Sequence, residues 1–143
     1  MLRVEESILI KRPVDSVFAY LADAGNWVYW TSEVLEAKQT SAGEFGVGTT
    51  FQGIDRIMGF RVSWTSIISE YEPNKKFSHV LTSGKNLVEQ HLNFATVEGG
   101  TNFTFAYVLK SSGMPSFVNP ILITIMRRGI RRNLRKLKVI LES

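Results

Sequence analysis

The stretch KKFSHVLTSGKNLVEQHLNFATVEGGTNFTFAYVLK, residues 75 to 110, decides the fold. Two short pairs that contain glycine, Gly84-Lys85 and Gly99-Gly100, divide it into three segments rich in aromatic and β-branched residues. Short glycine-containing loops between such segments are typical of consecutive β-hairpins. We therefore predict three antiparallel strands here.

The two turns also sort the side chains into two faces. As two-residue loops, they pair His79 with Gln90 and Phe94 with Phe105. The mainly aromatic face holds Phe77, His79, Leu81, Val88, Gln90, Leu92, Phe94, Phe103, Phe105, Tyr107 and Leu109. The mainly polar face holds Ser78, Thr82, Glu89, His91, Asn93, Asn102, Thr104 and Lys110. This contrast is typical of a sheet with one wetted face. Because the two histidines fall on opposite faces, we expect no metal site.

An earlier hairpin is predicted around Met58-Gly59. It adds further residues to the aromatic face: Phe51, Ile57, Phe60, Val62 and Trp64. It also places Asp55 on that face, which does not fit an apolar core. A bulge at Gly53 or a different register would explain the exception.

Helices are predicted on either side of the strands. A first strand with Val4, Ile8 and Ile10 on one side precedes Pro13, a good helix start, and two short helices. After residue 115 a helix of about 25 residues is predicted. Its inner arc consists of Val118, Leu122, Ile125, Met126, Gly129, Ile130, Asn133, Leu134, Leu137 and Leu141. Its other face, which we expect to be solvated, carries Arg127, Arg128, Arg131, Arg132, Arg135 and Lys138.

Composition favours one globular domain over residues 1–143. The chain has 143 residues, 44% of them hydrophobic and 21% charged, and no cysteine. Its net charge is +4. Residues 127–142 have a net charge of +6, so the rest carries −2. Charges at Arg3, Glu5 and Glu6 argue against a signal peptide. The charge-free stretch 111–126 contains prolines and is too short to span a membrane. We expect a cytoplasmic protein, a monomer or homodimer, without a cofactor.

Five segments in this order resemble the START-like, helix-grip (SRPBCC) superfamily, and most closely its polyketide cyclase/dehydratase and lipid-transport-like branch. They are ILIKRPVDSVFAYLADAGNWVYW (Ile8–Trp30), GVGTTF (Gly46–Phe51), EYEPNKKF (Glu70–Phe77), GGTNFTF (Gly99–Phe105) and NLRKLKVILE (Asn133–Glu142). The resemblance implies an α+β fold in which a curved antiparallel sheet of about seven strands grips the C-terminal helix around an apolar cavity. It does not imply one activity.

Three functions remain open. The first is binding, transport or sequestration of a small hydrophobic ligand, such as a lipid, isoprenoid or polyketide-like molecule. The cavity wall would consist of Trp30, Phe51, Phe77, His79, Gln90, Phe94, Phe105, Tyr107, Ile125, Met126, Gly129 and Asn133. The second is a cyclase or dehydratase that uses His79 and Tyr107, and also Asp55, as acid and base. The third is binding of an anionic membrane or nucleic acid through the basic helix face, although no motif specific for nucleic acid accompanies it.

Several residues have two interpretations each. Gly129 and Asn133 interrupt the apolar arc either to leave space and a hydrogen-bonding group for a ligand, or because Gly129 packs closely on the sheet and Asn133 lies near its open end. Trp27, Tyr29 and Trp30 either line a cavity entrance or cap the core, and capping is favoured for Trp30. The apolar start of the last helix, at Phe117, Val118, Ile121 and Ile123, is either covered by the first helices or exposed to a membrane or partner.

Overall fold

The computed structural model describes residues 1–111, 113 and 115–143. Ser112 and Met114, which belong to the charge-free stretch before the last helix, lie outside the described residues. The elements are β1 (Leu2–Ile10), α1 (Val14–Ala22), the 3-10 helix η1 (Ala24–Asn26), α2 (Trp27–Trp30), β2 (Val34–Gln39), β3 (Thr50–Ile57), β4 (Phe60–Glu72), β5 (Lys76–Ser83), β6 (Asn86–Val97), β7 (Gly100–Ser111), the 3-10 helix η2 (Ser116–Val118) and α3 (Asn119–Glu142).

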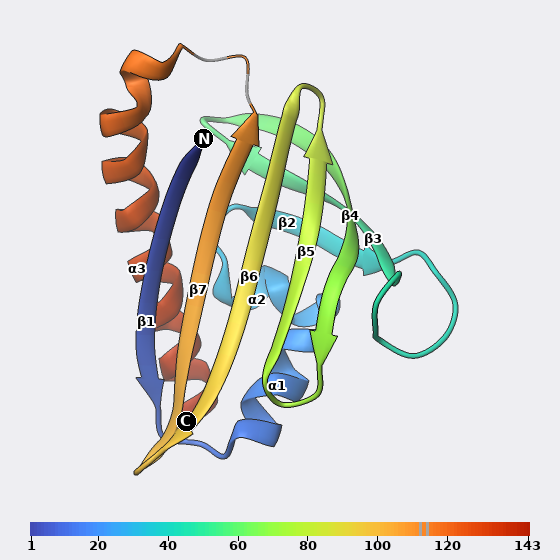
Figure 1. Ribbon diagram of the computed structural model, residues 1–143, viewed down its shortest axis with the longest axis vertical. Helices are drawn as coiled ribbons and strands as arrows, with labels where there is room; N and C mark the ends of the chain where they lie inside the picture. Colours follow the sequence, from blue (N-terminus) through green and yellow to red (C-terminus); the bar gives the residue numbers. More distant parts are fainter. Residues whose placement is uncertain (112, 114) are drawn as a thin grey trace.

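The strands form one antiparallel sheet in the order β1-β7-β6-β5-β4-β3-β2. The sheet curls, so that β2 at its far edge crosses behind β6 and β5, and α3 runs beside β1 (Figure 1). The helices α1 and α2 lie within this curl. The predicted α+β architecture, a seven-stranded curved sheet with two short helices after β1 and a long C-terminal helix, is confirmed. No helix in the described part of the chain is long and apolar enough to cross a membrane.

The hairpin registers agree with the predicted faces, with one correction. Strands β5 and β6 pair as predicted, with His79 opposite Gln90. Strands β6 and β7 pair Phe94 with Phe103, not with Phe105, because the loop is Glu98-Gly99. Side chains alternate with a period of two along a strand, so this shift of two residues leaves every side chain on its predicted face. It brings Tyr107 directly opposite Gln90.

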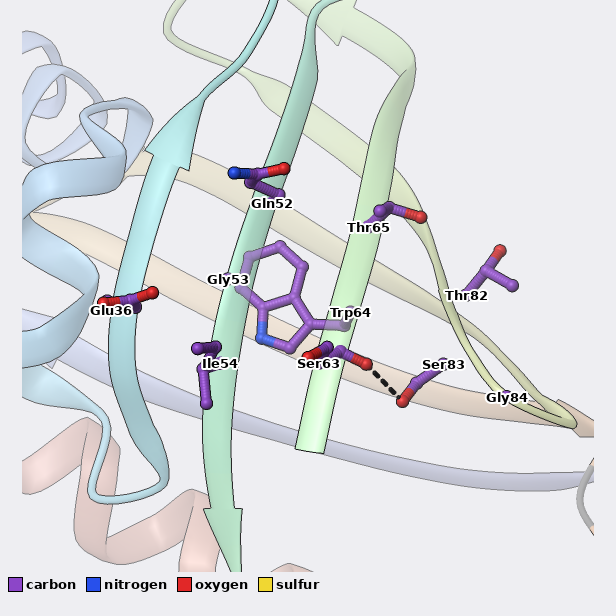
Figure 2. A pocket seen from close by; sticks show the side chains of 10 residues that line it. All are labelled: Glu36, Gln52, Gly53, Ile54, Ser63, Trp64, Thr65, Thr82, Ser83 and Gly84. Atoms are coloured by element: carbon purple, nitrogen blue, oxygen red, sulfur yellow. Dashed lines mark hydrogen bonds between the residues drawn. The ribbon is translucent and has the colours of Figure 1, made fainter. Parts of the chain in front are cut away.

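Asp55 lies on the inner face without a bulge at Gly53 or a different register. The β3–β4 pairing is continuous from Thr50 to its turn, as the predicted Met58-Gly59 loop requires. The Trp64 indole nitrogen donates a 2.8 Å hydrogen bond to Asp55 Oδ1, and this bond accommodates the carboxylate on the inner face. The Trp64 ring lies against Gly53 (Figure 2), where a side chain would not fit.

The core lies between the inner face of the sheet and the helices. Phe18 of α1 contacts Phe77 and Phe94, with ring centroids 5.7 and 5.0 Å apart. From α2, Trp27 covers Phe51. Apolar side chains of the second half of α3 complete the core and are buried: Ile130, Leu134 and Leu137.

The two halves of α3 differ in burial. In the first half Ile125, predicted on the inner arc, is 61% exposed, and Phe117 and Ile121 beside it are exposed too. The placement of Ile125 was therefore wrong, because the first turns of α3 turn Leu122, Ile123 and Met126 toward the core and leave Ile125 on the exposed side. The alternative that the helix start is exposed holds for Phe117 and Ile121.

The basic face of α3 is solvated only in part. The prediction that the whole face is solvated is therefore wrong for Arg127, Arg131 and Lys138, which bond to other groups of the protein. Glu6 of β1 accepts hydrogen bonds from Arg127 Nη1 at 3.0 Å and Arg131 Nε at 2.6 Å. Lys138 Nζ donates to Leu9 O and to Glu142. Because α3 lies along the edge strand β1, the flank of its basic face reaches groups of that strand.

Candidate functional site

A row of polar side chains crosses the inner face of the sheet. His79 on β5 is paired with Gln90 on β6, and Gln90 is paired with Tyr107 on β7. The alternation that puts aromatic residues inside puts these three there as well. His79 is buried, whereas Gln90 and Tyr107 are partly exposed. The row therefore leads from the core toward a more open part of the inner face.

His79 is a neutral, buried member of this row. It is 4% exposed, and its Nε2 donates a 2.8 Å hydrogen bond to Gln90 Oε1. Burial lowers the pKa of His79 to about 4, although the bond to Gln90 opposes the shift. The Trp27 ring lies 5.5 Å from the imidazole ring, centre to centre, and covers it. Nδ1 is buried and has no hydrogen-bond partner among the described residues.

Tyr107 and Asp55 come from distant strands, but the charge of Asp55 affects the pKa of Tyr107. Burial raises the pKa of Tyr107 to about 12, and the negative charges of Asp55 and Glu33 raise it further. Burial also raises the pKa of Asp55, with a smaller contribution from Glu33, while the hydrogen bond from Trp64 opposes the rise. Tyr107 is thus a protonated donor near two acidic groups.

Asn133 uses its amide to join α3 to the start of β2. Its Oδ1 accepts a 3.1 Å hydrogen bond from the Ser32 backbone, and its Nδ2 donates to both carboxylate oxygens of Glu33 at 3.2 Å. A buried amide needs such partners. The amide is therefore occupied by the protein itself.

Gly129 lies one turn before Asn133, on the same face of α3. A Cβ atom built on it would meet nothing within 4 Å, so of the two alternatives for Gly129 the one of close packing on the sheet is wrong. Met126, one turn earlier, is partly exposed. The helix therefore has open space beside Gly129, while Met126 packs against the edge of the core.

The other predicted ligand-binding residues lie deeper. Phe51, Phe77, Phe94 and Phe105 are buried under α1 and α2, with Trp30 edge-on to Phe105. Trp30 caps the core, as favoured from the sequence, while Tyr29 is 59% exposed. A ligand would reach these four phenylalanines only if the short helices moved.

Two shallow hollows, of about 300 and 310 Å³, lie on the outer face of β3 to β5. Figure 2 shows one of them, with Gln52, Thr65 and Thr82 along it and the hydrogen bond from Ser83 to the backbone of Ser63. Their exposed side chains are mainly hydroxyl and amide groups. Neither hollow includes a member of the polar row.

The sequence did not point to Glu33 or Trp64 as parts of this site, and it gave Trp27 only as a candidate for the cavity entrance or the core cap. Trp64 was placed on the correct face, but its bond to Asp55 depends on side-chain geometry. Glu33 approaches Asp55 because the next residue, Val34, pairs with Asp55 across β2 and β3. No turn signal near residue 33 predicts that pairing.

The comparisons with known proteins agree with this architecture. A family model described as "Polyketide cyclase / dehydrase and lipid transport" matches residues 1–142. No curated protein matches the chain.

Similar solved structures cover the whole fold at low sequence identity. A START superfamily protein from Mycobacterium smegmatis has a TM-score of 0.82 at 11% identity, covering 98% of this chain and 97% of its own. The ZhuI aromatase/cyclase from Streptomyces sp. R1128 has a TM-score of 0.79 at 16% identity, covering 98% and 93%. A protein from Thermus thermophilus, TTHA0849, has a TM-score of 0.75 at 17% identity, covering 96% and 93%. These likenesses show a shared helix-grip, START-like fold, and the family match shows that the chain belongs to the polyketide cyclase/dehydrase and lipid transport family.

Proposed function

We propose that this protein binds a small, mainly apolar ligand between the inner face of the sheet and the first half of α3. The observation that carries the proposal is the polar row, whose open end at Gln90 and Tyr107 lies on an otherwise apolar face. Buried apolar surface would supply most of the binding free energy, at about 25 cal/mol per Å². A few polar groups would orient the ligand, as in most small-molecule sites.

Gly129 supports this position for the ligand. A glycine inside a helix costs about 1 kcal/mol relative to alanine, and at Gly129 no close contact of the fold requires it. Space beside the helix is what a ligand between α3 and the sheet needs. Met126, Gly129, Gln90 and Tyr107 are therefore the proposed ligand contacts, and His79 positions Gln90.

The acidic groups near Tyr107 determine which kind of polar group on a ligand can bind there. Its hydroxyl is a donor near two acidic groups, Asp55 and Glu33, and the groups that shift its pKa are both acidic. A ligand hydroxyl or carbonyl accepts a bond from Tyr107 without repulsion, whereas a carboxylate is repelled. We expect a neutral polar group on the ligand.

Binding of a long-chain alcohol, followed by tryptophan fluorescence and native mass spectrometry, tests the proposal. We expect saturable binding of one alcohol per chain, and binding of the matched carboxylate weaker by about ten-fold. Gly129→Leu should abolish binding by filling the space beside α3. Arg128→Leu, which places the same side chain at the exposed neighbouring position, is the control. If neither probe is retained, or if Gly129→Leu binds like the wild type, the proposed site is wrong.

Catalysis of the cyclase or dehydratase type is the second candidate, favoured by the proximity of Asp55 and Tyr107. Tyr107 stays protonated and suits a general acid, and Asp55 with its raised pKa suits a general base. His79 is less suited because Trp27 covers it. With a poly-β-ketone substrate, Asp55→Asn should then abolish turnover but retain binding. Equal turnover by this variant would exclude the catalytic role.

A further inference from the structure

One end of the molecule exposes apolar side chains from two separate segments. In the β3–β4 hairpin, Met58 is 92% and Phe60 74% exposed, and Ile57 beside them is exposed. At the start of α3 and just before it, Phe117, Ile121 and Ile125 are exposed as well. Figure 1 shows the hairpin tip and the start of α3 at the same end of the long axis. We call these six residues the apolar end.

The hairpin tip is built against the local preferences of a β-turn. Met58 has φ of 52° and Gly59 84°, the left-handed pair of a two-residue turn that favours asparagine, aspartate or glycine at its first position. An apolar side chain there gains nothing from the turn and is almost wholly exposed to water. Neither the left-handed backbone conformation nor exposure to water therefore explains a methionine at position 58.

Positive charge surrounds the same tip. Arg56 and Arg61 are directly opposite each other on β3 and β4, just behind Ile57 and Phe60, and both are exposed. Like charges opposite each other on neighbouring strands are destabilising. On α3, exposed Arg128 follows the apolar residues by one turn. An anionic surface would offset this repulsion.

We propose that the apolar end docks on an anionic lipid membrane, with the hairpin tip and the start of α3 entering the interface and the arginines contacting lipid headgroups. Apolar side chains flanked by arginine are the pattern of interfacial membrane binding. A second copy of this chain is a poorer occupant, because the two ends would bring the same arginines together. This surface is separate from the proposed ligand contacts, and it shares only Arg128 with the basic face of α3 considered above.

Co-sedimentation of the full chain with vesicles tests the docking. We expect binding to phosphatidylcholine vesicles containing phosphatidylglycerol, and much weaker binding to phosphatidylcholine alone. Phe60→Ser should reduce the partition coefficient by about ten-fold through lost apolar burial. Arg56→Gln and Arg61→Gln should each reduce it by about five-fold, and only on anionic vesicles. Circular dichroism checks that the variants fold.

Val139→Ser is the matched control. Val139 is 69% exposed on the same helix, near its other end, so its replacement should leave binding unchanged. The proposal is overturned if wild type does not sediment with anionic vesicles, or if Phe60→Ser binds as wild type does. It is also overturned if only Arg131→Glu with Arg135→Glu abolishes binding, because the basic face would then be the membrane surface.

Discussion

His79 is kept neutral by its position in the sheet, and its pKa of about 4 lies well below its ordinary value of 6.5. The strand alternation forces it inward, and Gln90 satisfies one nitrogen. A charged imidazole at this depth would lose its hydration without an anionic partner among the described groups that shift its pKa. The residue therefore links the stability of the fold to pH.

Acidification should destabilise the protein through His79. Between pH 6.5 and about pH 4, the unfolded chain binds a proton at His79 that the folded chain does not bind. The free energy of unfolding therefore falls as the pH falls through this window. The full effect is about 3 kcal/mol. Urea denaturation across this window should show a shallower decline for His79→Gln, with His91→Gln as the control. Equal declines in wild type and His79→Gln would contradict the assignment.

Replacing Gly53 and Gly129 by alanine should change the stability of the fold in opposite directions. At Gly53 a Cβ atom would lie 2.3 Å from Trp64 Cζ2 and 2.5 Å from the Glu36 carbonyl oxygen. Gly53→Ala should therefore lower the free energy of unfolding by about 1–3 kcal/mol or more. Gly129→Ala, in a helix with open space, should raise it by about 1 kcal/mol. Urea denaturation of both variants checks the pair. A stabilised Gly53→Ala would mean that Trp64 does not pack on Gly53.

Among the elements, α3 is held by groups that its apolar pattern did not reveal. The apolar residues of its second half fix it to the core, and Glu6 of β1 fixes its middle through Arg127 and Arg131. Asn133 connects the same helix to the start of β2. These polar contacts leave fewer free cations on the basic face for nucleic acid than the sequence indicated.

Removing the Glu6 carboxylate should loosen this attachment. Burial would raise the pKa of Glu6, but hydrogen bonds and charges from Arg127 and Arg131 outweigh it and lower the pKa below 4.5. The stabilisation that Glu6 gives to the fold is therefore fully present above pH 4.5, and it is lost as the pH falls through the lowered pKa of Glu6. Since both arginines are partly exposed, Glu6→Gln should cost only about 1 kcal/mol.

A double-mutant cycle with Arg131→Gln measures this coupling in urea denaturation. Glu5→Gln, at an exposed pair with Arg3, is the control and should cost less. A coupling energy of zero at low ionic strength would show that Glu6 does not anchor α3.

At the scale of the whole molecule, the curl of the sheet brings Asp55 of β3 near Tyr107 of β7. The two strands are separated by β4, β5 and β6 in the sheet order. In a flat sheet the two side chains would be too far apart for the charge of Asp55 to affect the pKa of Tyr107. The curl thus places an acidic group, Asp55, near Tyr107 on the inner face.

Neutralising Asp55 should lower the pKa of Tyr107. Burial, the larger cause, remains, so the pKa of Tyr107 in Asp55→Asn should fall from about 12 but stay above 10.0. Ultraviolet titration of tyrosinate, with Tyr107→Phe to identify the signal, measures the shift. An unchanged value would mean that the two side chains are farther apart than the fold places them.

Local sequence patterns by themselves determined which strand residues face inward and where the last helix lies. The alternation along residues 75–110 fixed which side chains face inward. Even a loop placed one residue off, which shifts the pairing by two residues, kept the faces, because the side-chain period of a strand is two. Helical periodicity likewise determined α3 and its buried residues Asn133, Leu134 and Leu137. These features depend only on the residues within one element or one hairpin.

Only the tertiary structure decided which inward residues remain open. The sequence treated Phe77 and Tyr107 alike as cavity wall, but α1 covers the first and leaves the second partly exposed. It also placed Ile125 inside, although this side chain is exposed in the structure. Such differences depend on how far each helix reaches across the curled sheet, and this is set by contacts between distant segments that no local pattern contains.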